Sequence, residues 1–214
     1  MTIRTSILAL LFLLGVVPAV PAIAGWSAVR DLVRSGDALT DEKAREKIYR
    51  KAYTTAILSV KAGPNVSNEY LWLANAAGRL ALVADVKERI ALSKVVKDNA
   101  ERAIALDARN GAAYMTLGAW HFYVADLSWV QKNAAKVLYG GLPPASYEKG
   151  IELLTKALVL GVENPVEVYY IRGRAREELD RDAAASEDYR RCIAGSPRNA
   201  KEREMQADAR DRLD

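Results

Sequence analysis

The sequence predicts an all-α protein in which antiparallel pairs of helices stack into a right-handed solenoid. Apolar residues recur at spacings of three and four along the chain, and no stretch alternates apolar and polar residues as a half-buried strand would. Two expected helices carry an aromatic residue with Gly four positions later, at Tyr114–Gly118 and Tyr169–Gly173. The second is followed by Ala185, Tyr189, Cys192 and Pro197, the spacing expected of a small-residue helix closed by proline.

Together these spacings match the tetratricopeptide repeat, a unit of two antiparallel helices. Small residues allow the two helices to approach closely, aromatic residues fill the space beside them, and proline ends the second helix before the next unit. A stacked repeat of this kind is typical of a binding scaffold rather than of a catalyst.

Residues 1–24 are expected to be a secretory signal peptide. Arg4 supplies a basic start, Ile7–Val17 an apolar core, and Ala22-Ile23-Ala24 a small-residue cleavage signature before Gly25. The alternative is a retained membrane anchor, but the apolar run of about eleven residues is shorter than the roughly 20 that span a bilayer. We therefore expect a periplasmic mature protein, residues 25–214, without stable membrane insertion.

Composition excludes several classes of function. The 31 basic and 27 acidic residues are interspersed, and removing Arg4 with the signal leaves 30 against 27, so a basic nucleic-acid-binding face is not expected. Cys192 is the one cysteine, which excludes an internal disulfide. It replaces the usual alanine of the repeat and is expected to be a small buried residue.

The first half of the mature chain predicts two helical pairs. A weaker pair at 26–63 has helices at Ser27–Ser35, closed by Gly36, and at Asp41–Lys61. The first clear repeat, 69–110, pairs Glu69–Val83 with Val86–Leu106.

The second half predicts two further repeats and a cap. In the repeat 111–165, Ala112–Leu138 is one long helix or a broken pair, and Gly140–Pro144 separates it from the partner helix Tyr147–Leu160. The repeat 166–197 pairs Val166–Leu179 with Ala183–Ala194. The polar helix 199–213 is expected to cap the stack.

The second repeat contains about twenty extra residues between Gly118 and Gly150, rich in aromatic residues. This insertion resembles the tetratricopeptide family named regulator of microtubule dynamics, which has bacterial secreted members. The matching positions are Trp120, Phe122, Val124, Leu127, Ser128, Trp129, the turn Gly141–Tyr147, and Lys156-Ala157. Trp72-Leu73-Ala74 resembles the opening of an earlier family repeat, with Leu73 where arginine is usual. The resemblance implies a helical scaffold that binds a partner and has no catalytic residues; its microtubule name does not transfer to a periplasmic protein.

Catalytic, metal and cofactor sites are not expected. His121 is the one histidine and is interpreted as a packing residue, because a structural zinc site needs more His or Cys ligands. His121, Asp126 and Ser128 could form a hydrolase triad only on paper, since no nucleophile-elbow motif surrounds the serine. No phosphate-binding, dinucleotide-binding or Ca²⁺-loop motif is present in the sequence.

The expected binding surface is a concave groove lined by the first helix of each repeat. Its predicted residues are Tyr70, Leu73, Ala77, Met115, Ala119, Phe122, Tyr170 and Arg174. Among them Phe122 is expected to be an accessible anchor, whereas Trp129 is expected in the core. Arg172 and Arg174 could hold a carboxylate of the partner.

Two functions follow as hypotheses. The first is a periplasmic scaffold that binds a peptide or protein through this groove. The second is a carrier of a small apolar ligand, accessory to envelope transport. A closed cavity lined by Trp120, Phe122 and Leu138 would favour the carrier, and an open groove would favour the peptide.

Overall fold

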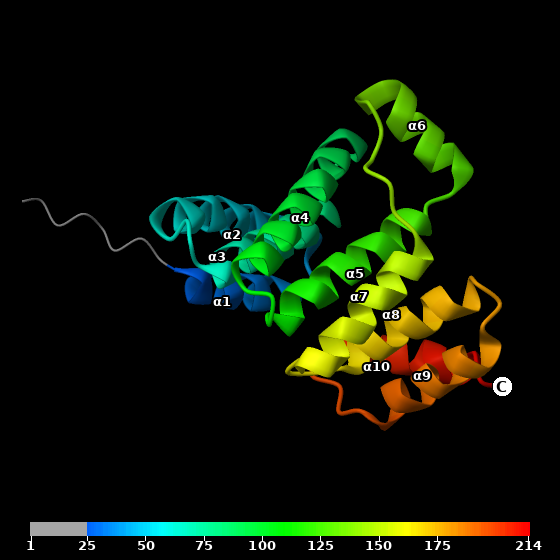
Figure 1. Ribbon diagram of the computed structural model, residues 1–214. Helices are drawn as coiled ribbons and strands as arrows, with labels where there is room; N and C mark the ends of the chain where they lie inside the picture. Colours follow the sequence, from blue (N-terminus) through cyan, green and yellow to red (C-terminus); the bar gives the residue numbers. More distant parts are fainter. Residues whose placement is uncertain (1–24) are drawn as a thin grey trace, which may run out of the picture.

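The computed structural model describes residues 25–214, so the expected signal peptide lies outside the described residues. Every regular element between residues 25 and 214 is an α-helix (Figure 1), which confirms the all-α class. The helices are α1 (Trp26–Asp37), α2 (Glu42–Ala62), α3 (Ser67–Ala81), α4 (Val86–Leu106), α5 (Gly111–Ala125), α6 (Trp129–Tyr139), α7 (Tyr147–Leu160), α8 (Val166–Glu177), α9 (Asp182–Ala194) and α10 (Ala200–Asp211).

Eight of these helices form a two-layered stack. The most extensive packing joins α1 with α2, α3 with α4, α5 with α7, and α8 with α9. The first helices of these pairs also contact one another in order, α1 with α3, α3 with α5, and α5 with α8. The chain is therefore a tetratricopeptide-like solenoid with α1, α3, α5 and α8 in one layer. Helix α10 packs on α8 and α9 and closes the C-terminal end.

The N-terminal pair is anchored by a buried carboxylate rather than loosely attached. The side chain of Glu69 on α3 accepts a hydrogen bond from the Trp26 backbone N–H at 3.2 Å and another from the Ser59 hydroxyl. Val29, Val33 and Ala52 are buried against Leu73 of α3. These contacts join both helices of the pair to the first clear repeat.

Helical glycines mark the closest helix crossings. A Cβ atom on Gly118 would lie 2.8 Å from the Leu154 side chain of α7, and one on Gly173 would lie 2.7 Å from the Tyr189 ring of α9. Gly36, expected to end the first helix, lies inside α1, where a Cβ atom would overlap the Tyr49 ring. Glycine is therefore required at these positions by the neighbouring helix.

We expect Gly118→Ala and Gly173→Ala each to lower the free energy of unfolding by about 1–3 kcal/mol, because the added methyl overpacks the crossing. Gly78→Ala is the matched control: the nearest atom to its Cβ, on Val96, is 3.7 Å away. Since alanine favours helix, the control should be neutral or stabilised by up to about 1 kcal/mol. Urea denaturation of the three variants measures this, and equal stabilities would contradict the assigned crossings.

Two expectations about the aromatic insertion are wrong. Phe122 is 2% exposed and belongs to a core cluster with Leu154 and Ile171, so it is not the accessible anchor that the sequence predicts. It lies four residues after Gly118, on the same face of α5, and that face packs against α7. Trp129, expected in the core, is 77% exposed.

The exposure of Trp129 follows from a break in the helix. The Ser128 side chain accepts a hydrogen bond from the Gln131 backbone N–H, and the Gln131 side chain accepts one from the Ser128 backbone N–H. This capping box starts a new helix, so the apolar periodicity of α5 does not continue into α6. Of the two alternatives for Ala112–Leu138, the structure therefore has the broken pair.

Candidate functional site

The layer of first helices curves so that its two ends approach each other. Arg34 on α1 lies 3.7 Å from Glu163 in the α7–α8 loop, and Arg198, before α10, lies 3.2 Å from the same carboxylate. These groups are far apart in sequence, and α1 and α8 are not adjacent in the layer. The inner surface between α1, α3, α5, α8 and α10 is therefore concave.

A pocket of about 320 Å³ lies on this surface where α5, α8 and α10 meet. We call it the α5–α8–α10 pocket. It is lined by Phe122, Tyr123, Asp126, Tyr170, Arg174, Lys201, Glu204, Met205 and Asp208. It is open to solvent and combines aromatic and thioether surface with charges of both signs. Such a pocket suits a short apolar group flanked by polar ones.

The aromatic residues of the pocket are Phe122 and Tyr123, adjacent on α5, and Tyr170 of α8. Phe122 contributes the edge of a buried ring, while Tyr123, one residue later and turned by about 100° around the helix axis, is 46% exposed. Desolvation by the surrounding protein and the negative charge of Glu167 raise the pKa of Tyr123. Tyr123 is thus accessible but surrounded by protein, as expected for a residue in a concavity.

Arg174 is the cation closest to the aromatic surface. Its guanidinium carbon lies 5.6 Å from the centre of the Phe122 ring, and Nη1 donates to the Tyr170 hydroxyl at 3.3 Å. The Tyr170 hydroxyl in turn donates to Asp208 of α10 at 2.8 Å. The Nε of Arg174 is buried and has no hydrogen-bond partner within the described residues. A buried unpaired donor costs about 1–3 kcal/mol, so an acceptor supplied by a bound molecule would be stabilising.

Further charges continue along the concave surface. Arg79 on α3 pairs with Asp37 at 2.9 Å, and Lys201 on α10 pairs with Glu167 on α8 at 2.7 Å. Desolvation opposes ionisation of Glu167, but the positive charges of Lys201 and Arg79 outweigh it and hold the pKa of this carboxyl below its usual range. The surface therefore remains charged at neutral pH, with both signs represented.

The predicted groove residues do not form one surface. Met115, Ala119, Phe122 and Tyr170 belong to one cluster of α5, α7 and α8, and Arg174 stacks on it. Leu73 and Ala77 are buried in two other core clusters, so their assignment to an open groove is wrong. Tyr70 packs in a further cluster, and its hydroxyl donates to the Pro64 carbonyl. The binding role of the remaining residues stays a prediction.

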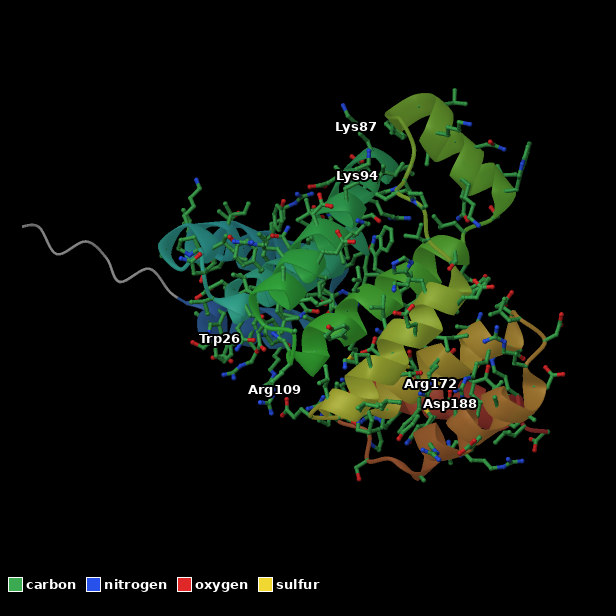
Figure 2. The ribbon with its side chains drawn as sticks, viewed as in Figure 1. Trp26, Lys87, Lys94, Arg109, Arg172 and Asp188 are labelled. Atoms are coloured by element: carbon green, nitrogen blue, oxygen red, sulfur yellow. The ribbon has the colours of Figure 1, made fainter. Side chains whose placement is uncertain are left out.

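Arg172 has its carboxylate partner within the chain. Its Nε and Nη2 donate to the two oxygens of Asp188 on α9, at 2.8 and 2.6 Å, and both side chains are buried (Figure 2). The expectation that Arg172 could hold a partner's carboxylate is therefore wrong. Arg174, two residues later, faces the pocket instead.

The three residues of the hypothetical hydrolase triad, His121, Asp126 and Ser128, each have separate structural contacts. His121 packs edge-on against Trp120, and its Nδ1 accepts a hydrogen bond from the Ser146 backbone N–H at 3.4 Å. Desolvation and the charges of neighbouring lysines lower the pKa of His121. Asp126 accepts from the Tyr147 hydroxyl, and Ser128 caps α6. His121 thus packs as the sequence indicated.

Tyr123, Lys201, Met205 and Asp208 line the pocket but are not among the groove residues that the sequence predicts. Tyr123 could have been found by counting from Gly118, because the residue five positions later faces away from the helix that the glycine contacts. The sequence gives no indication that α10 residues line a pocket. A polar terminal helix is predicted to be a solvated cap, and only its packing on α8 shows which of its residues face the pocket.

Comparisons with known proteins match the chain to one family over its described length. The family model described as "Regulator of microtubule dynamics protein 1-3" matches residues 23–214. The chain is 25% identical over 118 residues to regulator of microtubule dynamics protein 1 of Mus musculus and 28% identical over 120 residues to protein 3 of Rattus norvegicus. These alignments cover 55% and 56% of this chain but 39% and 26% of the two relatives, so the chain spans well under half of their length.

A crystal structure of a thermophilic TPR protein from Thermus thermophilus superposes with a TM-score of 0.47 at 17% identity, covering 85% of this chain and 98% of that one. Separately, none of the helices in residues 25–214 combines the length and hydrophobicity needed to cross a bilayer.

Proposed function

This chain belongs to the regulator of microtubule dynamics protein 1-3 family, and we propose that it is a non-catalytic periplasmic scaffold. Its partner is an extended protein or peptide segment that enters the α5–α8–α10 pocket. The single observation that carries this proposal is the open, mixed-polarity pocket in which the Nε of Arg174 has no hydrogen-bond partner among residues 25–214.

The chemistry of the pocket defines the partner segment. An apolar or aromatic side chain would contact Tyr123 and Met205, while a carboxylate or carbonyl oxygen of the same segment would accept from Arg174. Aromatic and arginine side chains that become buried on binding commonly supply most of the binding energy of an interface.

The carrier hypothesis receives less support from the geometry. Trp120 and Phe122 lie in different core clusters, and Leu138 is exposed on α6. These three residues therefore do not enclose one cavity, which was the arrangement that would favour a small apolar ligand.

Site-specific photo-crosslinking in the periplasm tests the proposal. A photoreactive phenylalanine analogue at position 123 should crosslink a discrete partner, while the same analogue at the exposed Val159 of α7 should not. Arg174→Gln should reduce the crosslinked product at least about tenfold, since it removes an anchor worth at least about 1.4 kcal/mol. Arg190→Gln, an exposed arginine on α9, is the matched control.

Equal crosslinking from both positions, or an Arg174→Gln variant that crosslinks as strongly as the parent, would contradict the pocket as the binding site. Recovery of the protein from the cytoplasm alone would contradict the proposed location.

A further inference from the structure

Helix α6 exposes an apolar face that nothing in the described structure covers. Its large exposed side chains are Trp129, Val130, Val137 and Leu138. Two more exposed apolar residues, Leu82 and Val86, lie at the turn into α4, the helix whose backbone comes close to α6. These six are the majority of the ten large hydrophobic side chains that are exposed among residues 25–214. The exposed apolar surface is therefore concentrated at one end of the molecule.

The geometry of α6 orients this face away from the protein. At 100° per residue, Val130 and Val137 lie at the centre of the apolar arc, with Trp129 and Leu138 toward its edges. The opposite side carries Ala135, which is buried. Figure 1 shows α6 projecting from the body of the stack beside the end of α4. The apolar face thus points to solvent.

Local contacts define both ends of this helix. The capping box of Ser128 and Gln131 begins it, and Gly140, in the left-handed conformation at φ 73°, ends it, with the Gly141 N–H donating to the Ala135 carbonyl at 2.9 Å. The Lys132 ammonium also donates to the last carbonyl of α5, on Ala125, at 2.7 Å. The helix therefore has its own start and stop signals and does not depend on a covering element for its ends.

The charge around the apolar face is positive. Residues 127–147 contain no Asp or Glu. Of the two lysines on α6, Lys136 lies next to Trp129 around the helix axis, whereas Lys132 lies on the opposite side and donates to the Ala125 carbonyl. Lys87 and Lys94 of α4 lie at the same end of the molecule (Figure 2). The acidic residues at the start of α4 already have partners within the protein. Asp85 caps that helix, and Glu88 forms a bidentate ion pair with Arg50. A basic rim thus borders the apolar face.

This charge distribution discriminates between possible occupants. In a two-fold pairing of α6 with a second copy, the Lys136 side chains at the edges of the two apolar faces would find no acidic residue on either helix to pair with. Phosphate groups of anionic lipids would instead complement the lysines, and apolar side chains with a tryptophan suit the boundary between headgroups and acyl chains. With 11 residues, α6 is too short to span a bilayer but long enough to lie in its surface.

We propose that α6 docks the protein onto the surface of an anionic lipid bilayer. Trp129, Val130, Val137 and Leu138 enter the interfacial region, and Lys136, at the edge of the apolar face, contacts lipid phosphates. The docking surface lies on the inserted helix and is separate from the α5–α8–α10 pocket.

Vesicle co-sedimentation of the purified mature protein tests this proposal. The protein should partition onto vesicles that contain phosphatidylglycerol and much less onto phosphatidylcholine vesicles, and high salt should reduce the binding. Val137→Asp should weaken the partitioning at least about tenfold, because it places a negative charge at the centre of the apolar face. Lys136→Gln should weaken binding to the anionic vesicles alone.

The matched control is Val159→Asp, which changes a valine of similar exposure, 76% against 80%, on α7. It should bind vesicles like the parent, and both aspartate variants should keep the parent's helical circular dichroism and melting temperature. Absence of parent binding to anionic vesicles, or equal binding by the two aspartate variants, would overturn the proposal. So would a parent dimer in analytical ultracentrifugation that Val137→Asp alone converts to monomer, since a second copy would then occupy the face.

Discussion

Phe122→Ala is expected to lower the free energy of unfolding by about 3–5 kcal/mol, the usual cost of truncating a fully buried phenylalanine. The Phe122 ring is 2% exposed and packs against Leu154, Val168 and Ile171, so three helices would border the cavity. The stacked guanidinium of Arg174 would also lose its aromatic surface. Chemical denaturation monitored by circular dichroism measures the change.

Trp129→Ala is the control from the same insertion. The indole is 77% exposed at the start of α6, so its truncation should change the stability by no more than about 0.5 kcal/mol. A destabilised Trp129→Ala variant together with an unchanged Phe122→Ala variant would mean that the insertion folds back onto the body with the opposite register.

The helical pairs were predictable because their signals are local. Gly118 and Gly173 each stand where a partner side chain approaches within 3 Å of the space for a Cβ atom, and such close crossings tolerate few residue types. The position of a small residue in a helix therefore reports where the next helix lies. The breaks were equally local, since the Gly140–Pro144 segment cannot continue a helix.

Whether an individual side chain of a helix is buried or exposed was less predictable from the sequence. Leu73 and Ala77 are predicted on an open face of α3, but both are buried, because α3 packs on α1, α2, α4 and α5 at once. A helix with four neighbours retains only a narrow exposed strip, and composition does not locate that strip. The same holds at the pocket, where Phe122 is buried while the next residue, Tyr123, is exposed.

The pocket and the ion pair of Arg172 depend on contacts distant in sequence. Met205 and Asp208 reach the pocket from α10, and Asp188 reaches Arg172 from α9. Neither contact follows from the spacing of residues within one helix. Arg172 and Arg174 look alike in sequence, yet one is satisfied inside the protein and the other has an unpaired donor among the described residues.

The buried ion pair between α8 and α9 is the basis of the second large effect. The Asp188 carboxylate is 1% exposed and accepts hydrogen bonds from Arg172 and from Arg176, the latter at 2.8 Å. Arg172 also donates to the Thr155 hydroxyl of α7 at 3.0 Å. One carboxylate thus compensates two guanidinium groups at the junction of the last two repeats.

Asp188→Ala should therefore destabilise the protein by about 3–5 kcal/mol, because it leaves the buried Arg172 without its counter-charge. Glu187→Ala, which removes the neighbouring exposed carboxylate paired with Arg191, should cost at most about 1 kcal/mol. Combining Asp188→Leu with Arg172→Met should recover much of the loss, since an apolar pair of similar volume needs no counter-charge. If the double variant is as unstable as Asp188→Ala, Arg176 is the group left uncompensated, and Asp188 serves chiefly that arginine. Chemical denaturation of the parent and the three variants measures these differences in the free energy of unfolding. The side chains of Arg172 and Arg176 are 8% and 19% exposed, so the more buried Arg172 should account for most of the loss of stability.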